Sequence, residues 1–536
     1  MKKLFNFKTF ALIIAAALLL SLASCSAAPG FGDMLNKDEA AMDGMIGGEI
    51  PPGNGAQSGN DVSIPNWDEE IAPGEENIGE NEDETTSSSP TFVENPFVNT
   101  SENNISTFSA DVDTASYSYF RKLVNGGYGF NNLKNGGSAF RTEEFINYFK
   151  YDVAGPEHDD LFGVYSEMSP CPWNEENMLL RVTLQAEQGD IDKPNNLVFL
   201  IDVSGSMSSS DKLPLLKKAF SYLVSNLDGD DTISIVTYSG REAIVLDGCN
   251  GLDSTKIMNA INSLNASGST NGEAGLNMAY QIAEKHFKAD GNNRIIMASD
   301  GDLNVGISSA DQLKSYIEEK RNAGVYLSVL GFGTGNYQDE KMETLADNGN
   351  GVYYYIDGET EAEKVFGSDI FSTLYTVAED VKLQIEFNTQ RVESYRLIGY
   401  ENRKLANEDF ENDKKDAGEV GASHQVTVCY EIKPRVIGPD EDIIDAPMAI
   451  LRVRYKNPGE SLSLLNEYML HGPTSRVSDD QKFIGAVIET CMLLYGSEYA
   501  GDITLEDIVE DLDALELTDP YKAEFRSLLK GLLEEK

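Results

Sequence analysis

The sequence predicts an α/β protein with a doubly wound, mainly parallel sheet, flanked by an antiparallel β-sandwich-like region and a C-terminal helical region. Three observations carry this prediction. Between about residues 195 and 378, short apolar runs alternate with amphipathic helical segments, which is typical of right-handed βαβ units. After residue 379, apolar and polar residues alternate with a period of two, as in half-buried strands. From residue 478 the apolar period becomes helical.

The central segment begins with Leu197–Ile201, an apolar run of strand length that is typical of a strand buried on both faces. In sheets of this kind, binding sites lie outside the carboxyl ends of the strands. The elements expected next are a helix at 212–227, strands at 232–238 and 243–246, helices at 254–263 and 275–288, a strand at 294–299, a helix at 309–321, a strand at 325–330, a helix at 340–347, a strand at 352–356 and a helix at 361–378.

The last third of the chain changes from strands to helices. Strands are expected at 381–387, 392–398, 423–432 and 449–455, in a small sandwich that also takes in strands from the residues before the central segment, such as 178–184. Ser478-x-x-Gln481 fits a capping box at the start of a helix. Further helices are expected at 504–515 and 520–533.

The charge balance and the scarcity of soft ligands exclude several functions. The 536 residues contain 42 Lys and Arg against 89 Asp and Glu, a formal net charge of −47, so a nucleic-acid partner is not expected. Four His lie far apart without an HExxH, and five Cys form no CxxC, which disfavours a zinc site or a His-based hydrolase. The run Gly331–Gly335 lacks a full GxGxxG, so no nucleotide is expected either.

The N-terminus has the build of an export signal. Three lysines precede the apolar run Phe10–Leu20, which is shorter than the ~20 residues that a helix needs to span a bilayer. The following Leu22-Ala23-Ser24-Cys25 resembles a bacterial lipobox, in which the Cys is acylated, for example with palmitate, and becomes the new N-terminus. Residues 1–25 are therefore expected to be a lipoprotein signal peptide, and Cys25 the membrane anchor. An ordinary signal peptide with a chance Cys is the alternative.

Residues 26–95 are expected to be a disordered acidic linker. They hold 16 Asp and Glu against the single Lys37, together with many Gly, Pro, Ser and Asn. Low apolar content with high like charge does not build a core. A flexible chain of this length spans roughly 45–50 Å, which suits a spacer between lipid and folded part.

Polar residues follow two strands of the central segment directly. Asp202 and Asp300 each end a strand, Ser204 and Ser206 follow the first of them, and Thr270 lies in a loop between them. Two carboxylates and three hydroxyls form a set of hard oxygen ligands that suits Mg²⁺ or Mn²⁺. With few carboxylates bound, such an ion keeps positive charge and could take an acidic group of a partner as a further ligand.

Asp202-x-Ser204-x-Ser206, Thr270 and Ser299-Asp300-Gly301 resemble the metal-ion-dependent adhesion site of von Willebrand factor type A (VWA) domains. The resemblance implies a VWA, Rossmann-like fold and a bound Mg²⁺, Mn²⁺ or Ca²⁺. It implies that the Ser and Thr side chains bind the metal directly or through water and that the two Asp hold it or orient its waters. Ser299 stands where the family often has Thr, which keeps a hydroxyl. A family fold with a vacant or purely structural site is the alternative.

Two flanking runs extend the resemblance. Residues 106–117 (STFSADVDTASY) and 141–149 (RTEEFINYF) are similar to the N-terminal extension of a bacterial subfamily of VWA lipoproteins that also ends in a helical region. Asp111 and Asp113 could be metal ligands, but an Asx-turn or N-cap role for Asp113 or Thr114 is the other interpretation. The domains expected are a signal peptide at 1–25, an acidic linker at 26–95, the extension at 96–190, a VWA domain at 191–378, a β-rich domain at 379–476 and a helical region at 477–536.

These observations favour a binding protein rather than an enzyme. Ser206 has no base near it in sequence, and no GxSxG is present. The function expected is a lipid-anchored, extracytoplasmic module at the cell membrane or outer membrane that engages an acidic group of an unidentified protein partner through its metal. The alternative is a structural or regulatory subunit of a cell-envelope assembly in which the metal is only structural. The four cysteines left after processing give no readable disulfide pairing, and buried thiols are expected.

Overall fold

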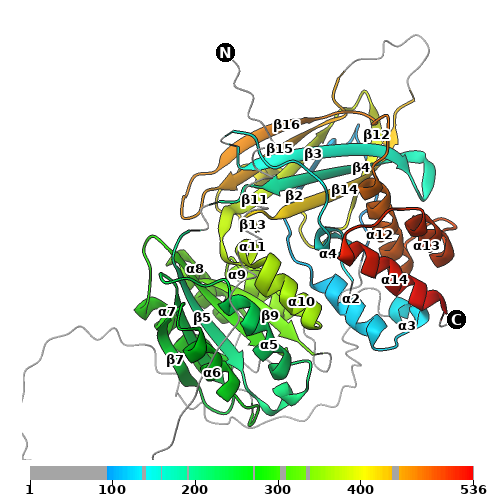
Figure 1. Cartoon of the computed structure of the whole chain (residues 1–536). Coiled ribbons are helices and arrows are strands. Elements are labelled where there is room, and N and C mark those ends of the chain that lie inside the picture. Colours follow the sequence, from blue (N-terminus) through cyan, green and yellow to red (C-terminus); the bar gives the residue numbers. More distant parts are fainter. Residues whose placement is uncertain are drawn as a thin grey trace, which may run out of the picture. The chain divides into compact units, whose positions relative to one another are not determined.

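The computed structural model describes residues 93–135, 140–158, 160–189, 192–269, 272–301, 310–333, 339–436 and 446–534. From Thr86 onward the chain forms one compact unit, and every element below belongs to it (Figure 1). The expected signal peptide, Cys25 and the linker up to residue 92 lie outside the described residues. Within the described part of the chain, no helix combines the length and the apolar character needed to cross a membrane.

The central part contains a six-stranded sheet in the order β10-β9-β8-β5-β6-β7. Neighbouring strands are parallel, except that β7 pairs antiparallel with β6 at one edge. The chain starts at β5 in the middle and winds outward both ways, so the predicted doubly wound sheet is confirmed. The strands are β5 (Asn195–Asp202), β6 (Thr232–Tyr238), β7 (Ala243–Asn250), β8 (Asn292–Ser299), β9 (Tyr326–Phe332) and β10 (Tyr353–Ile356).

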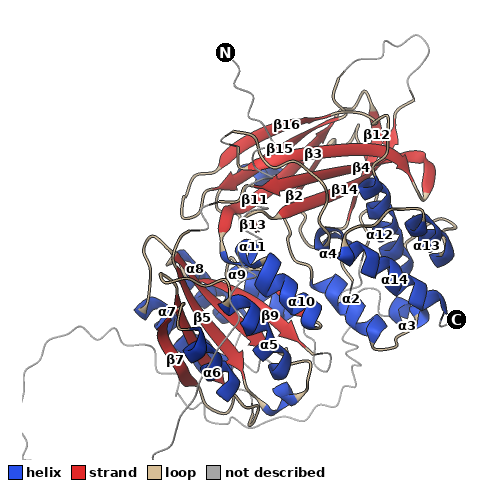
Figure 2. Cartoon of the chain, viewed as in Figure 1, coloured by secondary structure: helices blue, strands red, loops and turns tan. Residues whose placement is uncertain are grey.

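Helices cover both faces of this sheet (Figure 2). In β5 every residue is buried, and the alternation of a strand divides its apolar side chains: Phe199 packs toward one face and Leu200 toward the other. The first face is covered by α5 (Leu213–Val224), α6 (Ser254–Ser263) and α10 (Glu359–Glu363), and the second by α7 (Gly272–Lys285), α8 (Ala310–Asn322) and α9 (Asp339–Asn348).

Two antiparallel sheets form the predicted β-sandwich, and the segment before the central part contributes strands to both. One sheet has the order β1-β12-β14-β4-β3. In the other sheet, one side of β11 pairs with β15, and β15 pairs in turn with β16. The opposite side of β11 pairs with β13 and β2. The strands are β1 (Val98–Asn99), β2 (Ile105–Ser109), β3 (Phe162–Cys171), β4 (Asn174–Ala186), β11 (Thr376–Phe387), β12 (Val392–Ile398), β13 (Gly418–Gly421), β14 (Gln425–Pro434), β15 (Ala449–Lys456) and β16 (Leu464–Leu470).

The helices of the N-terminal extension and of the C-terminal region share one aromatic core. Phe149, which follows α4, lies 4.8 Å from Phe483 of α12 and 5.7 Å from Phe525 of α14 between ring centroids. The two segments therefore fold together although they are far apart in sequence. The helices concerned are α2 (Ala115–Asn125), α3 (Phe130–Asn135), α4 (Thr142–Tyr148), α12 (Asp479–Tyr495), α13 (Leu505–Asp513) and α14 (Pro520–Glu534).

Buried ion pairs join the flanking parts to the central one. Arg121 of α2 is 2% exposed, and its guanidinium lies 2.6 Å from Asp357 and 2.7 Å from Glu361, both after β10. The same guanidinium lies 3.0 Å from Glu524 of α14. A planar guanidinium can hold several carboxylates in fixed directions, so Arg121 links three segments at one point.

The structure corrects two boundaries. The helix expected at 361–378 is wrong beyond Leu374: a π-helical turn at Lys364–Ser368 leads into α11 (Ile370–Leu374), and β11 begins at Thr376. The β-branched Thr376 and Val377 favour a strand, and pairing with β13 and β15 completes it. The linker expected to end at residue 95 is ordered earlier, since Glu94 forms an ion pair with Arg396 at 2.7 Å.

The capping box at α12 forms in a different way from the one predicted. The Ser478 hydroxyl accepts a hydrogen bond from the Gln481 amide at 3.0 Å, as expected. The Gln481 side chain instead donates to the Leu179 carbonyl, and Glu167 of β3 accepts from the Ser478 amide. A residue distant in sequence thus replaces the local half of the box. The four cysteines at 171, 249, 429 and 491 are free and buried.

Candidate metal centre

Asp202 ends β5 and anchors the loop that carries the two serines. Its side chain is fully buried, and its Oδ1 accepts a hydrogen bond from the Ser204 amide at 2.8 Å. This contact fixes the chain direction directly after the strand and brings Ser204 and Ser206 together, with their Oγ atoms 2.9 Å apart. The sequence spacing of two residues between these groups therefore places three oxygen-bearing side chains at one end of β5.

Backbone hydrogen bonds tie this loop to its neighbours at the same rim of the sheet. The Val203 amide donates to the carbonyl of Tyr238 at the end of β6 (3.0 Å), and the Gly205 amide donates to the carbonyl of Gly268 (3.0 Å). Gly268 has φ +84°, a conformation that favours glycine, and it lies two residues before Thr270. Thr270 itself lies outside the described residues, but the chain that leads to it is held against the serine loop.

Asp300 follows β8, the strand next to β5, and is buried with 3% exposure. Its Oδ2 lies 2.8 Å from the ammonium of Lys212, whose side chain is 12% exposed. Lys212 comes directly before α5, and its aliphatic chain passes over Gly333, where a Cβ would approach the lysine Cε to 2.1 Å. The structure thus adds to the predicted site a lysine that the sequence analysis missed. Its position only six residues after Ser206 could have indicated that it lies near the metal site.

Tyr238 forms the floor of the site. It is fully buried at the end of β6, and burial raises the pKa of its hydroxyl well above the ordinary value, with the negative charge of Asp202 raising it further. The Tyr238 hydroxyl therefore stays neutral. β5 pairs with β8 up to Ile201 and Ala298, so Asp202 and Asp300 follow neighbouring strands at the same end of the sheet.

The donor set fits a hard divalent cation. Ligands at neighbouring vertices of an octahedron with metal–oxygen distances of ~2.0–2.1 Å lie about 2.9 Å apart, and the Ser204 and Ser206 Oγ atoms have this spacing. Asp202 and Asp300 supply carboxylates, and every side chain involved offers oxygen rather than sulfur or nitrogen. These residues, with Thr270, would hold Mg²⁺, Mn²⁺ or Ca²⁺, and Lys212 would share Asp300 with the ion.

Comparison with known proteins gives the family. The family model described as von Willebrand factor type A domain matches residues 196–368, that described as von Willebrand factor matches 83–181, and that of the C-terminal region of YfbK matches 372–533. The chain is 40% identical over 464 residues to the protein YfbK of Escherichia coli (strain K12), covering 82% of this chain and 80% of that one. The chain belongs to the YfbK family. The expected VWA domain of a bacterial protein is thereby confirmed.

Two more distant relatives match parts of this YfbK-family chain. The human inter-alpha-trypsin inhibitor heavy chain H3 is 26% identical over 267 residues, which is 46% of this chain and 29% of that protein. A solved structure, the von Willebrand factor type A protein from Catenulispora acidiphila, is 15% identical, covers 64% of this chain and 80% of its own, and has a TM-score of 0.38.

Other acids near the YfbK-family motif have different roles. Asp211 forms an ion pair with Lys122 of α2 at 3.1 Å and accepts from the Ser209 hydroxyl. Although its partial burial acts in the opposite direction, these contacts hold the pKa of Asp211 below its ordinary value. Asp211 thus connects the N-terminal extension to the serine loop, while Glu273 is half-buried in the first turn of α7 and Asp302 lies outside the described residues.

Asp111 and Asp113 belong to a buried ion-pair network that we call the Arg403 cluster. Asp111, rather than Asp113, forms the Asx-turn, by accepting from the Asp113 amide at 3.1 Å. Asp113 accepts from the Tyr353 amide of β10 at 2.9 Å, and Thr114 is the N-cap of α2 without a side-chain cap bond. The Arg403 cluster consists of Asp111, Asp113, Glu144, Glu343 and Asp347 with Arg141 and Arg403.

Proposed function

We propose that this chain is a lipid-anchored, extracytoplasmic protein-binding module that engages an acidic group of a protein partner through a divalent cation at its VWA domain. The cation would be held by Asp202, Ser204, Ser206, Thr270 and Asp300, with Mg²⁺ the first choice and Mn²⁺ or Ca²⁺ possible in its place. The observation that carries the proposal is the placement of the two carboxylates and two hydroxyls at the carboxyl ends of the neighbouring strands β5 and β8.

The charge of the site supports capture of an acidic group. A divalent ion bound through two carboxylates has little negative charge around it, and Lys212 adds a positive charge at Asp300. A carboxylate from a partner would complete the coordination sphere and balance this charge. Ser206 is exposed, so the serine loop is reachable from outside, while Asp202 is buried beneath it.

The metal claim is tested by isothermal titration of the full chain with Mg²⁺. We expect one binding site in the parent and none in Asp202→Ala, because that substitution removes both a ligand and the acceptor of the Ser204 amide. Ser206→Ala is a milder variant at an exposed position, for which we expect weakened binding in a folded protein. Asp230→Ala, exposed just before β6 at the other end of the strands, is the matched control. Indistinguishable titrations for all four proteins would refute the metal site.

The partner claim needs a separate experiment. We expect crosslinking in the native envelope followed by mass spectrometry to capture a protein with the parent and the Asp230→Ala control, and to lose it with Ser206→Ala or after addition of EDTA. Capture that persists unchanged in EDTA would support the other interpretation, a subunit of an envelope assembly in which the metal is only structural.

The lipid anchor is proposed from the lipobox-like Leu22-Ala23-Ser24-Cys25 alone. Metabolic labelling with a fatty acid such as palmitate should mark the parent and fail on Cys25→Ala. An acyl chain gives reversible anchoring on a membrane and does not require a spanning helix. Equal labelling of the two proteins would exclude Cys25 as the anchor, and fractionation of the labelled parent would assign it to the cell membrane or the outer membrane.

A further inference from the structure

A second group of carboxylates lies away from the VWA motif, where the central part meets the sandwich. Its members, which we call the Glu419 cluster, are Asp380 of β11, Asp416 in the loop before β13, and Glu419 of β13. One carboxylate oxygen of each lies within 4.8 Å of those of the other two. Two oxygens bound to one Ca²⁺ at ~2.3–2.6 Å are at most about 5 Å apart, so the spacing of the three side chains is compatible with one shared ion.

The backbone of β11 turns Asp380 out of the regular ladder. Asp380 has φ +52°, and the register of β11 shifts around it against both β13 and β15. Such a bulge redirects a side chain that would otherwise follow the alternation of the strand. The Asp380 carboxylate consequently reaches a cavity of about 530 Å³.

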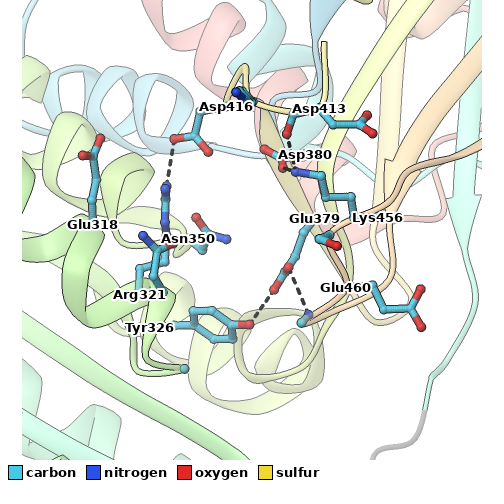
Figure 3. A pocket seen from close by; sticks show the side chains of 15 residues that line it. Glu318, Arg321, Tyr326, Asn350, Glu379, Asp380, Asp413, Asp416, Lys456 and Glu460 are labelled. Carbon is cyan, nitrogen blue, oxygen red and sulfur yellow. Dashed lines mark hydrogen bonds and ion pairs between the residues drawn. The ribbon is translucent and has the colours of Figure 1, made fainter. Parts of the chain in front are cut away.

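More acids than bases line the cavity, which lies between α8 with the start of β9 on one side and the β11 and β15 strands on the other (Figure 3). Arg321 of α8 donates to Asp416 at 2.8 Å, and Lys456 of β15 forms an ion pair with Asp380. Figure 3 shows these two cations meeting the two carboxylates from different sides of the pocket. The lining acids are Glu318, Glu379, Asp380, Asp413, Asp416 and Glu460, and the lining bases are Arg321, Lys414 and Lys456.

Glu419 supplies the observation that points to a ligand. Its side chain is only 8% exposed, and among the described residues its Oε1 has no hydrogen-bond partner. Burial raises the pKa of Glu419 well above the ordinary value, and the charges of Asp416 and Asp380 raise it further. A buried carboxylate oxygen without a donor is costly, and of the three bases that line the pocket, Arg321 and Lys456 are already engaged with the other two acids.

We propose that the Glu419 cluster binds a calcium ion that ties the VWA domain to the β-sandwich. The ion would fill the open acceptor of Glu419 and bridge it to Asp380 and Asp416, while the Asp416 to Arg321 pair links the bound loop to α8. Calcium suits the site because it accepts six to eight oxygens in flexible geometry, including carbonyls and waters that the open cavity admits. This site is separate from the VWA metal centre and does not depend on the function proposed for it.

The proposal is tested by titrating the full chain with Ca²⁺ in the Ser206→Ala background, which impairs the VWA site and leaves the Glu419 cluster intact. Glu419→Gln keeps the size of the side chain and removes its charge. Glu460→Gln, at the exposed rim of the same pocket, is the matched control. We expect Ca²⁺ binding in Ser206→Ala and with Glu460→Gln, and a loss of affinity with Glu419→Gln of at least the roughly 10- to 100-fold seen for second-shell changes at metal sites.

Thermal unfolding provides a second readout. Calcium should raise the Tm of the Ser206→Ala protein and of its Glu460→Gln derivative, and raise that of the Glu419→Gln derivative much less. Without calcium, Glu419→Gln should melt no lower than its parent, because it removes a buried charge, and this outcome confirms that the variant folds. Calcium binding by Glu419→Gln equal to that of Glu460→Gln would overturn the proposal, as would the absence of any calcium effect in the Ser206→Ala protein.

Discussion

The Arg403 cluster and the Glu419 cluster each bring three carboxylates within 4.8 Å of one another, yet they differ in what neutralises the charge. In the Arg403 cluster the three are Asp111, Glu144 and Glu343, all buried. The Arg403 guanidinium lies 3.3 Å from Asp111, 3.0 Å from Glu343 and 2.9 Å from Asp347. Arg141 pairs with Glu144 and Glu343, so a metal ion would have to displace both guanidinium groups to bind all three carboxylates.

The Glu419 cluster has a cation for two of its three carboxylates, and Glu419 keeps an open acceptor among the described residues. The VWA centre lies between these cases, because Asp300 is paired with a lysine that can move on a flexible chain, whereas a guanidinium holds several acids in a rigid fork. The pairing of the carboxylates with basic side chains, and not the number of carboxylates, therefore distinguishes a structural network from a cation site.

The largest effect is expected when the Arg403 cluster loses its central cation. Arg403→Met should lower the free energy of unfolding at pH 8 by about 3–5 kcal/mol, the range for breaking a buried ion pair by removing one partner. Urea denaturation measures it. Arg435→Met, at an exposed arginine after β14, is the control and should change stability by no more than about 0.5 kcal/mol.

The deficit of Arg403→Met should also depend on pH. Burial raises the pKa of Glu343 to about 8 even with both arginines present, and the pKa values of Asp113 and Asp347 are raised as well. A carboxyl group with a higher pKa in the folded than in the unfolded state destabilises the fold as the pH rises through that interval. The deficit should therefore shrink from pH 8 to pH 5, and a deficit that is equal at both would contradict this account of the Arg403 cluster.

Glu489 differs from the acids of the Arg403 cluster, because it is a buried carboxylate with further acids, rather than arginines, near it. Glu489 of α12 is 4% exposed, and burial, with Asp511 and Asp507 adding to it, raises its pKa to about 8. Because its folded pKa is raised, ionisation costs stability between about pH 4.5 and pH 8. Glu489→Gln should raise the free energy of unfolding by about 1–2 kcal/mol at pH 8 and by nothing at pH 4. Glu510→Gln, at an exposed position of α13, is the control and should leave the free energy of unfolding unchanged at both pH values. A Glu489→Gln protein that is less stable than the parent at pH 8 would contradict the prediction.

The local sequence pattern was enough to predict the central sheet and to locate the motif, because both are encoded by residues close to one another in sequence. The apolar run at 197–201 and the helical period after it require burial on two faces, and Asp202 lies directly at the end of its strand. Local pattern missed β3, whose Gly163 and Pro170 are tolerated because it is an edge strand paired with the long β4. It also could not show that the N-terminal extension shares a core with the C-terminal helices, since that contact joins distant segments.

The same limit explains what was missed at the sites. Asp111 and Asp113 were placed near a helix start, but their partner Arg403 lies about 290 residues away. Glu419 carried no signal at all, because its significance comes from two segments, one with Asp380 and one with Asp416 and Glu419, that meet only in the folded chain. Lys212 could have been noticed, since it lies at the end of the loop that holds both serines. Its effect on metal binding at the VWA centre is the smallest of the effects predicted here.

Lys212→Met should tighten Mg²⁺ binding at the VWA centre. The substitution removes a positive charge 2.8 Å from Asp300 while keeping an unbranched chain of similar length over Gly333. A unit charge at this range near a protein surface contributes at least about 1 kcal/mol, so the Kd should fall about fivefold. Lys218→Met, six residues further along the chain in α5 and in an exposed ion pair with Glu359, should leave the Kd unchanged in the same titration. Weaker binding by Lys212→Met would mean that the lysine holds Asp300 in place, as the arginines hold the acids of the Arg403 cluster. The VWA centre would then resemble that structural ion-pair network rather than a cation site.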